Sequence, residues 1–219
     1  MKIAIAYFVF FSCSLNAFSR NWELWDREKV AQTIDSYWLK SEEEIKHRKA
    51  IASLLREWIC PNDQILEIGC GSGLIYQQLS SLIPGQSYTG VDISEKMLEI
   101  ATQRFPEAHF MKEDLYGLSF PDNSFEITAA FEVFGHIDGI EKPISEMFRT
   151  TSRLAIFTVW SGPKTKFEKE VIQRATFIRT TFSEEDVRKA VESALKGENY
   201  SIAIRQISKD VSAYIISKL

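Results

Sequence analysis

The chain has 219 residues, of which 45% are hydrophobic and 26% are charged. This length and composition suit one globular α/β domain with some additions. The formal net charge of -4 excludes a broadly basic protein. We therefore expect no nucleic-acid partner, because binding to phosphates needs clustered Lys and Arg.

Residues 1–19 begin with a pattern that is typical of a secretory signal peptide. Lys2 precedes an unbroken apolar run over residues 3–11, and small residues follow the run. The run is too short to span a bilayer as a helix, but it would allow membrane contact. Two alternatives stay open: an apolar helix or strand of the fold, and a wrongly chosen start codon.

The cysteines are Cys13, Cys60 and Cys70. They have no metal-ligand spacing, and an odd number makes a poor disulfide framework, so we expect reduced thiols. Cys60 and Cys70 flank a predicted buried strand, which favours roles as small core residues.

The order of elements predicts an α/β fold. Residues 21–58 have helical spacing, with a new helix start at Ser41 before a run of acidic residues. Strands and helices then alternate, which predicts a mostly parallel sheet. The expected strands are residues 64–68, 87–91, 108–111, 125–131 and 153–160, and the expected helices are residues 74–82, 95–104, 140–150 and 184–195. Residues 200–207 and 211–217 predict a terminal antiparallel hairpin.

The strongest chemical signal lies in residues 65–73, with the sequence ILEIGCGSG. An apolar strand runs into Gly69, Gly71 and Gly73, and then into a helix. Glycines allow a tight turn and a close approach of the backbone to a ligand. The acidic Glu67 before them would repel a pyrophosphate but suits a ligand with an ammonium or sulfonium group.

This segment resembles motif I of the class I S-adenosylmethionine-dependent methyltransferases. The resemblance continues through residues 91–98, VDISEKML, where Asp92 ends the second strand. The family pattern implies that Asp92 binds both ribose hydroxyls. It also implies cofactor contacts from Cys70 in the loop and from Ile93 and Met97 after the strand.

Two later segments extend the resemblance. Residues 111–115 resemble the family step in which an acid, here Asp114, bonds the adenine amino group and the next residue, here Leu115, packs on the ring. Residues 130–137 resemble the segment that follows the fourth strand. There Phe131 is expected to line the cofactor pocket. His136 is the candidate general base, because its pKa is ordinarily near neutrality, and a packing or capping role is its alternative.

The resemblance implies transfer of a methyl group from S-adenosylmethionine, with S-adenosylhomocysteine as product, to an O, N or C atom of a small molecule or lipid precursor. No metal is expected, because no acidic cluster can be assigned as a metal site. The alternative is a non-catalytic S-adenosylmethionine-binding or scaffold protein on the same fold. A nicotinamide-dependent oxidoreductase is disfavoured by Glu67 and by the glycine spacing.

The sequence thus predicts a Rossmann-like three-layer sandwich with a mostly parallel seven-stranded sheet, a C-terminal antiparallel hairpin and extra N-terminal helices. The expected divisions are an apolar segment over residues 1–19, a helical cap over residues 20–62 and a methyltransferase domain over residues 63–219. The cap carries an aromatic cluster of Trp22, Trp25, Tyr37 and Trp38. The expected compartment is the cytoplasm, with export or membrane association as the alternative if residues 1–19 are a signal.

Overall fold

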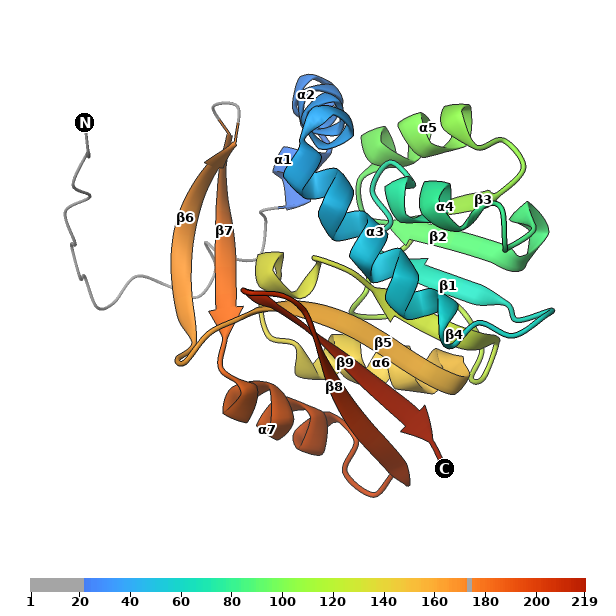
Figure 1. Cartoon of the computed structure of the whole chain (residues 1–219), viewed down its shortest axis with the longest axis vertical. Coiled ribbons are helices and arrows are strands. Elements are labelled where there is room, and N and C mark those ends of the chain that lie inside the picture. The colour runs from blue at the N-terminus through green and yellow to red at the C-terminus, as the bar shows by residue number, and fades with distance from the viewer. Residues whose placement is uncertain (1–21, 173–174) are drawn as a thin grey trace.

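A nine-stranded mixed sheet forms the centre of the protein, of which the computed structural model describes residues 22–172 and 175–219 (Figure 1). The strands are β1 Ile65–Ile68, β2 Tyr88–Asp92, β3 His109–Lys112, β4 Phe125–Ala130, β5 Thr151–Ser161, β6 Lys166–Ile172, β7 Ala175–Phe182, β8 Tyr200–Ser208 and β9 Val211–Lys218. Parallel pairing gives the order β3-β2-β1-β4-β5. β9 pairs antiparallel with β5 and β8, and the hairpin β6–β7 joins the end of β5.

The α-helices of the described residues cover both faces of this sheet. They are α1 Trp22–Trp25, α2 Glu28–Lys40, α3 Glu42–Arg56, α4 Leu74–Leu79, α5 Glu95–Arg104, α6 Glu141–Thr150 and α7 Glu184–Ala194. In Figure 1, α3 lies in front of the sheet and α6 behind it. Three helices begin at serine caps whose side chains accept a hydrogen bond from a backbone amide, and these are Ser41, Ser94 and Ser183. The helix start predicted at Ser41 is confirmed.

Alternating side chains give the sheet a separate apolar core on each face. On one face, Ile65 of β1 and Ile127 of β4 pack with residues of α3 and α4. On the other face, Leu66 of β1 and Ala130 of β4 pack with residues of α6 and α7. The three-layer α/β architecture follows from this division, and the predicted fold class, with its parallel core and C-terminal hairpin, is confirmed.

The sheet has nine strands where the sequence predicted seven, because residues 161–182 contribute the hairpin β6–β7. β6 has the sequence KFEKEVI, in which charged and apolar residues mix. Phe167 is 71% exposed and Val171 is 67% exposed. Since β6 lies at an edge of the sheet and buries little, its sequence lacks the apolar run of a central strand.

The predicted core role of the cysteines is right for one residue and wrong for another. Cys70 is buried, whereas Cys60 is exposed, because the segment between α3 and β1 turns at the surface instead of packing inward. Cys13 and the apolar residues 1–19 lie outside the described residues. No helix within residues 22–172 and 175–219 is long and apolar enough to cross a membrane.

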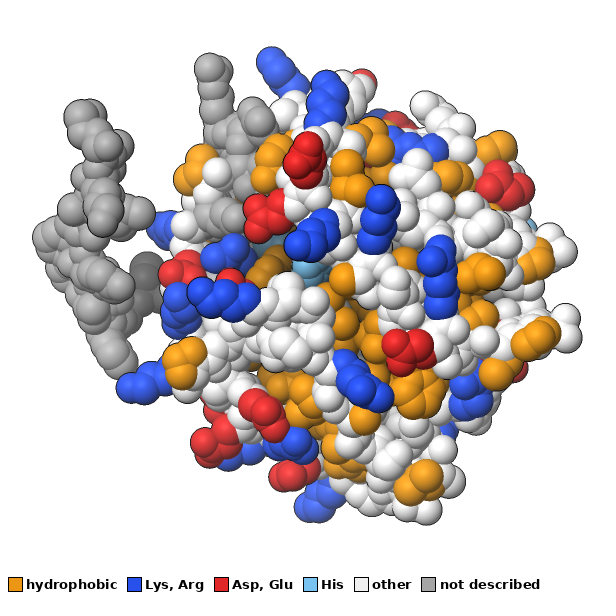
Figure 2. All heavy atoms as spheres, viewed as in Figure 1, with side chains coloured by type: hydrophobic (Ala, Val, Ile, Leu, Met, Phe, Trp, Pro, Cys, Tyr) orange, Lys and Arg blue, Asp and Glu red, His pale blue; other side chains and the backbone are white. Residues whose placement is uncertain are grey.

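The face seen in Figure 2 carries interspersed acidic and basic side chains. Over α7 they alternate as ion pairs one helical turn apart, such as Arg188 with Glu184 at 2.8 Å and Lys189 with Glu185 at 2.6 Å. Exposed pairs of this kind add little stability.

Candidate functional site

The glycine-rich loop follows β1 at the carboxyl edge of the parallel strands. The amides of Gly69 and Cys70 both donate to the carbonyl oxygen of Val91, at 2.7 and 3.0 Å, which ties the loop to β2. Gly69 has φ +68° and Gly71 has φ +52°. Residues other than glycine rarely adopt this region of φ. A Cβ at Gly69 would also lie 2.2 Å from Cγ2 of Val133. The glycines are therefore needed for the turn itself.

Asp92 ends β2 and holds the loop in place. Its Oδ2 accepts a hydrogen bond from the Gly71 amide and its Oδ1 accepts one from the Ser94 amide, both at 2.9 Å. Burial raises the pKa of Asp92, and the backbone donors oppose that rise. Because a carboxylate group offers about four acceptor positions, Asp92 keeps acceptor capacity for a ligand without releasing the loop.

Glu67 is a buried carboxyl group at the end of the loop's parent strand. The hydroxyl of Tyr88 donates to its Oε2 at 2.5 Å. Burial raises the pKa of Glu67 to about 8, the Tyr88 hydrogen bond opposes that rise, and the charge of Asp92 adds to it. Glu67 is therefore mostly protonated at pH 7, and a cation placed beside it would favour its charged form.

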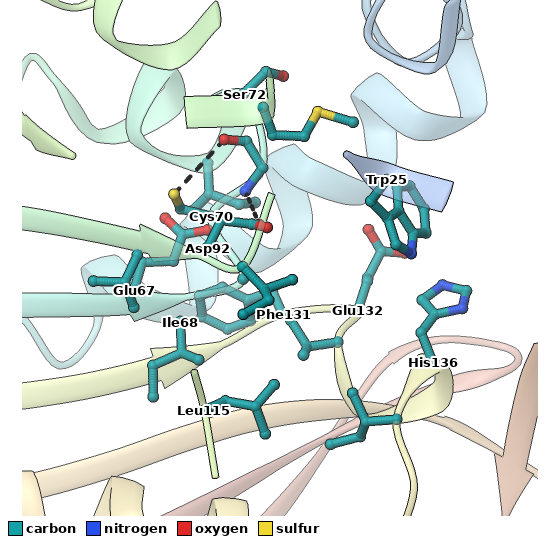
Figure 3. Close-up of a pocket in the computed structure, with 18 of the residues that line it drawn as sticks. Trp25, Glu67, Ile68, Cys70, Ser72, Asp92, Leu115, Phe131, Glu132 and His136 are labelled. Atoms are coloured by element: carbon teal, nitrogen blue, oxygen red, sulfur yellow. Dashed lines mark hydrogen bonds between the residues drawn. The ribbon is translucent and has the colours of Figure 1, made fainter. Parts of the chain in front are cut away.

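A cavity of about 590 Å³ opens beside these residues (Figure 3). This volume is typical of a small-molecule site. It is lined by the following residues that were predicted to hold the cofactor: Glu67, Gly69, Cys70, Gly71, Asp92, Ile93, Met97, Asp114, Leu115 and Phe131. Gly73 does not line the cavity. It is the N-cap of α4 with φ +79°, and a Cβ there would lie 3.0 Å from Cδ2 of Phe105, so it shapes the turn into the helix.

Asp114 and Leu115 form one edge of the cavity just beyond β3. The Oδ1 atom of Asp114 accepts a hydrogen bond from the Tyr116 amide at 2.9 Å, and its side chain is exposed. Leu115 is half-buried and packs on the core under α6 and α7. Figure 3 shows Leu115 near Ile68, on the opposite side of the cavity from Ser72. An apolar surface beside an acid suits a flat ring that carries a hydrogen-bond donor.

His136 lies at the other end of the cavity, on the 3-10 helix η3, Phe134–His136. Its Nδ1 lies 2.8 Å from the carbonyl oxygen of Ile178, so the neutral ring donates from Nδ1 and keeps Nε2 as an acceptor. Burial lowers the pKa of His136 to about 4. The imidazole is therefore neutral at pH 7, and its role as a general base stays a prediction.

Aromatic rings surround His136 and form a wall of the cavity. The centroids of the Trp25 and Trp160 rings lie 5.5 and 5.0 Å from that of His136. Trp25 stacks on Trp38 at 5.9 Å. Of the predicted aromatic cluster, Tyr37 is 41% exposed and does not line the cavity, and the side chain of Trp22 lies outside the described residues.

Four charged residues complete this end, and three of them, Glu44, Arg48 and Arg179, were not assigned to the site from the sequence. Glu44 and Arg48 come from α3, Glu132 follows β4, and Arg179 comes from β7. The only sequence signal for the first two was the cap at Ser41, which fixes the phase of α3. We call Trp25, Trp38, Glu44, Glu132, His136 and Trp160 the aromatic end of the cavity.

The N-terminal helices are fastened to the elements that hold the glycine loop. The Ser94 hydroxyl donates to the carbonyl oxygen of Trp25 at 2.8 Å, and the Lys96 amide donates to Oδ1 of Asp26 at 3.2 Å. Trp25 therefore covers the cavity from a fixed position beside the start of α5. Within the described parts of the chain, no group of three His, Cys, Asp or Glu side chains could hold a metal ion.

Comparison with known proteins gives a match over the same segment. Residues 65–153 match the family model of a methyltransferase domain. This segment runs from β1 into β5 and contains the glycine loop, Asp92 and Asp114. The matched part therefore holds the residues that surround the loop end of the cavity, whereas α1–α3 and β6–β9 lie outside it.

Two curated relatives are about one third identical to this chain within short aligned segments. A demethylmenaquinone methyltransferase from Thermotoga maritima is 38% identical over 87 residues, which are 39% of this chain and 37% of the relative. A malonyl-[acyl-carrier protein] O-methyltransferase from Bacillus cereus is 31% identical over 91 residues, which are 41% of this chain and 34% of the relative. The chain thus matches little more than a third of the length of either relative.

Among solved structures, an S-adenosylmethionine-dependent methyltransferase from Methanosarcina mazei superposes with a TM-score of 0.63 at 20% identity. The alignment covers 76% of this chain and 97% of that protein. At this level of identity the likeness concerns the fold. The solved structure shares the fold, and the two curated relatives match this chain over part of its length. The names of these two relatives give different methyl acceptors.

Proposed function

We propose that this chain, which belongs to the class I S-adenosylmethionine-dependent methyltransferase family, binds S-adenosylmethionine in the cavity and transfers its methyl group to a small-molecule or lipid-like acceptor. The observation that carries the proposal is the joint geometry of the glycine loop and Asp92. The Asp92 carboxylate holds the loop through the Gly71 amide at 2.9 Å and lines the cavity with acceptor capacity to spare.

The residues at the loop end fit the hydroxyl and hydrogen-bonding groups of this cofactor. Asp92 can accept two ribose hydroxyls, as a carboxylate with free lone pairs does. Ser72 also lines the cavity, and its Oγ is buried without a hydrogen-bond partner among the described residues. A polar ligand would supply that partner. Asp114 and Leu115 offer an acid and an apolar surface for the adenine ring.

The charge at the loop end fits a cationic ligand better than a pyrophosphate. Glu67 and Asp92 both line the cavity, and each has a pKa raised by burial. A pyrophosphate would add negative charge to this pair, whereas an ammonium or sulfonium group would stabilise the ionised carboxylates. This preference separates S-adenosylmethionine from a nicotinamide dinucleotide.

The cofactor supplies a methyl group on a positively charged sulfur, which is already a good electrophile. The protein's part is then to place acceptor and methyl group in line and to exclude water. Phe131 is buried between the loop end and the aromatic end. The rings of Trp25, Trp38 and Trp160 can cover an apolar acceptor, which supports a small-molecule or lipid-like substrate.

The first experiment is calorimetric titration of the full chain with S-adenosylmethionine, S-adenosylhomocysteine and NADH. We expect both adenosyl ligands to bind and NADH to show no saturable binding. Asp92→Ala is expected to abolish adenosyl binding, and the exposed turn variant Asp210→Ala to keep it. Binding of NADH alone, or normal affinity in Asp92→Ala, would overturn the site. Adenosyl binding without turnover on any acceptor would indicate the scaffold role instead.

A further inference from the structure

The hairpin β6–β7 carries two of the most exposed large apolar side chains of the protein. Phe167 is 71% exposed and Val171 is 67% exposed, and among the side chains that the structure describes only Leu219 at the C-terminus exceeds them. Figure 1 shows β6 at the end of the sheet, beyond β7. Single exposed apolar residues are ordinary, but two this close on one strand form a patch and point to a contact.

The alternation of side chains gives the hairpin two different faces. The register pairs Phe167 with Thr180, Lys169 with Ile178 and Val171 with Thr176. Because paired residues of antiparallel strands point to the same side, these side chains share one face, which we call the outer face. Ile178 is half-buried and lies between the two exposed apolar residues. The outer face is therefore largely apolar, with one lysine in its middle.

The opposite, inner face of the hairpin packs against the cavity. Phe177 is buried, and its ring centroid lies 4.5 Å from that of Trp25. The Arg179 guanidinium lies 5.7 Å from the centroid of the Trp160 ring. The inner face thus forms a wall of the aromatic end, and the outer face is the side that meets the surroundings.

The hairpin is basic in a chain that is acidic as a whole. Residues 163–180 contain five Lys or Arg and two Glu, whereas the net charge of the chain is -4. Glu168 lies 3.0 Å from Lys166 and belongs to the inner face. Lys169 is exposed on the outer face, and the exposed Lys164 precedes the strand. Apolar and basic side chains therefore occur together at the outer face.

This combination favours one kind of partner. A second copy of the chain would bring the same positive charge to the same face, which opposes pairing of two hairpins. The surface of an anionic bilayer carries negative headgroups above an apolar interior. Lysine stems lie along apolar surface while the ammonium groups reach the headgroups, and neighbouring apolar side chains leave water.

We propose that the outer face of the hairpin β6–β7 docks on an anionic phospholipid surface. Phe167 and Val171 enter the boundary between headgroups and acyl chains, and Lys164 and Lys169 lie beside the headgroup phosphates. The Ile178 carbonyl oxygen lies 2.8 Å from Nδ1 of His136 in the aromatic end, so docking brings the cavity next to the lipid. The docking goes beyond the proposed function and does not depend on it; only the capture of a lipid-like acceptor does.

The test is co-sedimentation of the full chain with two kinds of vesicle. One kind is phosphatidylcholine alone, and the other is phosphatidylcholine mixed with phosphatidylglycerol. We expect binding to the anionic vesicles to be at least about tenfold stronger, and to weaken as salt screens the lysines. Absence of binding to anionic vesicles, or equal binding to both kinds, overturns the proposal.

Variants locate the contact on the outer face. Phe167→Thr combined with Val171→Thr keeps residues that favour strands and should reduce binding to anionic vesicles at least about tenfold. Lys164→Gln combined with Lys169→Gln should reduce it at least about fivefold. The matched controls are Leu82→Thr, at a side chain that is 53% exposed elsewhere, and Lys209→Gln in the turn between β8 and β9. Undiminished binding in both hairpin variants would place the contact elsewhere in the chain and overturn the proposal.

Two further measurements separate the other outcomes. The melting temperature without vesicles reports that each variant is folded. Analytical ultracentrifugation without vesicles should give the same mass for the parent chain and the hairpin variants. A dimer that is lost in Phe167→Thr with Val171→Thr would show that the face joins two copies, and the lipid proposal would then be wrong. Failure of the chain to bind S-adenosylhomocysteine would defeat the proposed function and leave the vesicle result as it stands.

Discussion

The Arg104 guanidinium on α5 donates two hydrogen bonds to the Asp35 carboxylate on α2, at 3.0 and 2.8 Å. The same Nη1 atom donates to the Ser72 carbonyl oxygen at 3.0 Å. One side chain therefore joins an N-terminal helix to the glycine loop. Because α2 also carries Trp38, the position of the aromatic end depends on the same contact that orders the glycine loop.

Asp35→Asn is expected to weaken both ends of the cavity. The side chains of Arg104 and Asp35 are 21% and 11% exposed, so loss of one partner should cost about 2 kcal/mol of the free energy of unfolding. Affinity for S-adenosylhomocysteine should fall as well. Urea denaturation and calorimetry measure the two effects. Glu184→Gln, which breaks an exposed pair on α7, is the control. Unchanged affinity for S-adenosylhomocysteine in Asp35→Asn would show that the contact with α2 does not affect the glycine loop.

Gly69→Ala is expected to be much more harmful than Gly71→Ala. Both positions have positive φ, but a Cβ at Gly69 would lie 2.2 Å from Cγ2 of Val133, whereas a Cβ at Gly71 would meet Trp38 at 3.6 Å. We expect a loss of about 3 kcal/mol for Gly69→Ala and about 1 kcal/mol for Gly71→Ala in urea denaturation. Adding Val133→Ala should restore part of the first loss. Equal losses would mean that the backbone strain at positive φ, and not the contact with Val133, sets the loss in the free energy of unfolding.

Cofactor binding at pH 7 is expected to release a proton from Glu67. Its pKa of about 8 in the ligand-free protein keeps it mostly protonated, and a bound cation favours the charged form. Calorimetry in buffers of different ionisation enthalpy should show release of about 0.9 proton that disappears in Glu67→Gln. Equal proton release by parent and variant would place the cation elsewhere.

The same carboxyl group sets a pH dependence of stability with a definite sign. Its folded-state pKa lies above the ordinary value for glutamate, so the folded chain binds more protons than the unfolded chain between about pH 4.5 and 8. The contribution of Glu67 to stability is complete below this window and is lost as pH rises through it. The melting temperature of the ligand-free chain should fall less over this range in Glu67→Gln.

His136→Asn is expected to lower turnover more than affinity for S-adenosylhomocysteine. The imidazole is neutral over the ordinary pH range because its pKa is about 4, and its ring packs between Trp25 and Trp160. In the parent chain, kcat should therefore show no titration step near pH 6.5 that is missing in His136→Asn. If the parent chain shows such a step and His136→Asn lacks it, His136 titrates during the reaction.

The arrangement at the loop end of the cavity was predictable from the sequence because its residues are local. Glu67, Gly69 and Gly71 belong to one strand and its turn, and their spacing follows from the geometry of that turn. Asp92 ends the adjacent parallel strand, whose place beside β1 is implied by the alternation of strands and helices. Each inference needed only neighbouring residues and the right-handed connection between parallel strands.

The aromatic end was not predictable in the same way. Trp160 lies on β5 and Arg179 on β7, and they face Glu44 of α3 only through tertiary packing. No spacing along the chain relates these positions. The hairpin β6–β7 was missed for a related reason: exposed residues such as Phe167 give an edge strand no buried pattern. The N-cap at Ser41 does place Glu44, His47 and Arg48 on one face of α3, but it does not say what that face meets.

The two ends of the cavity can also change independently of one another in related chains. Most residues of the loop end lie in one continuous stretch, residues 67–115, inside the segment that matches the family model. The aromatic end is assembled from residues 25–48 and 132–160, largely from helices and strand ends around that segment. On the proposed function, substitutions there would exchange one acceptor for another and leave the methyl donor's site intact. Related chains would then diverge in substrate while they inherit the same glycine loop.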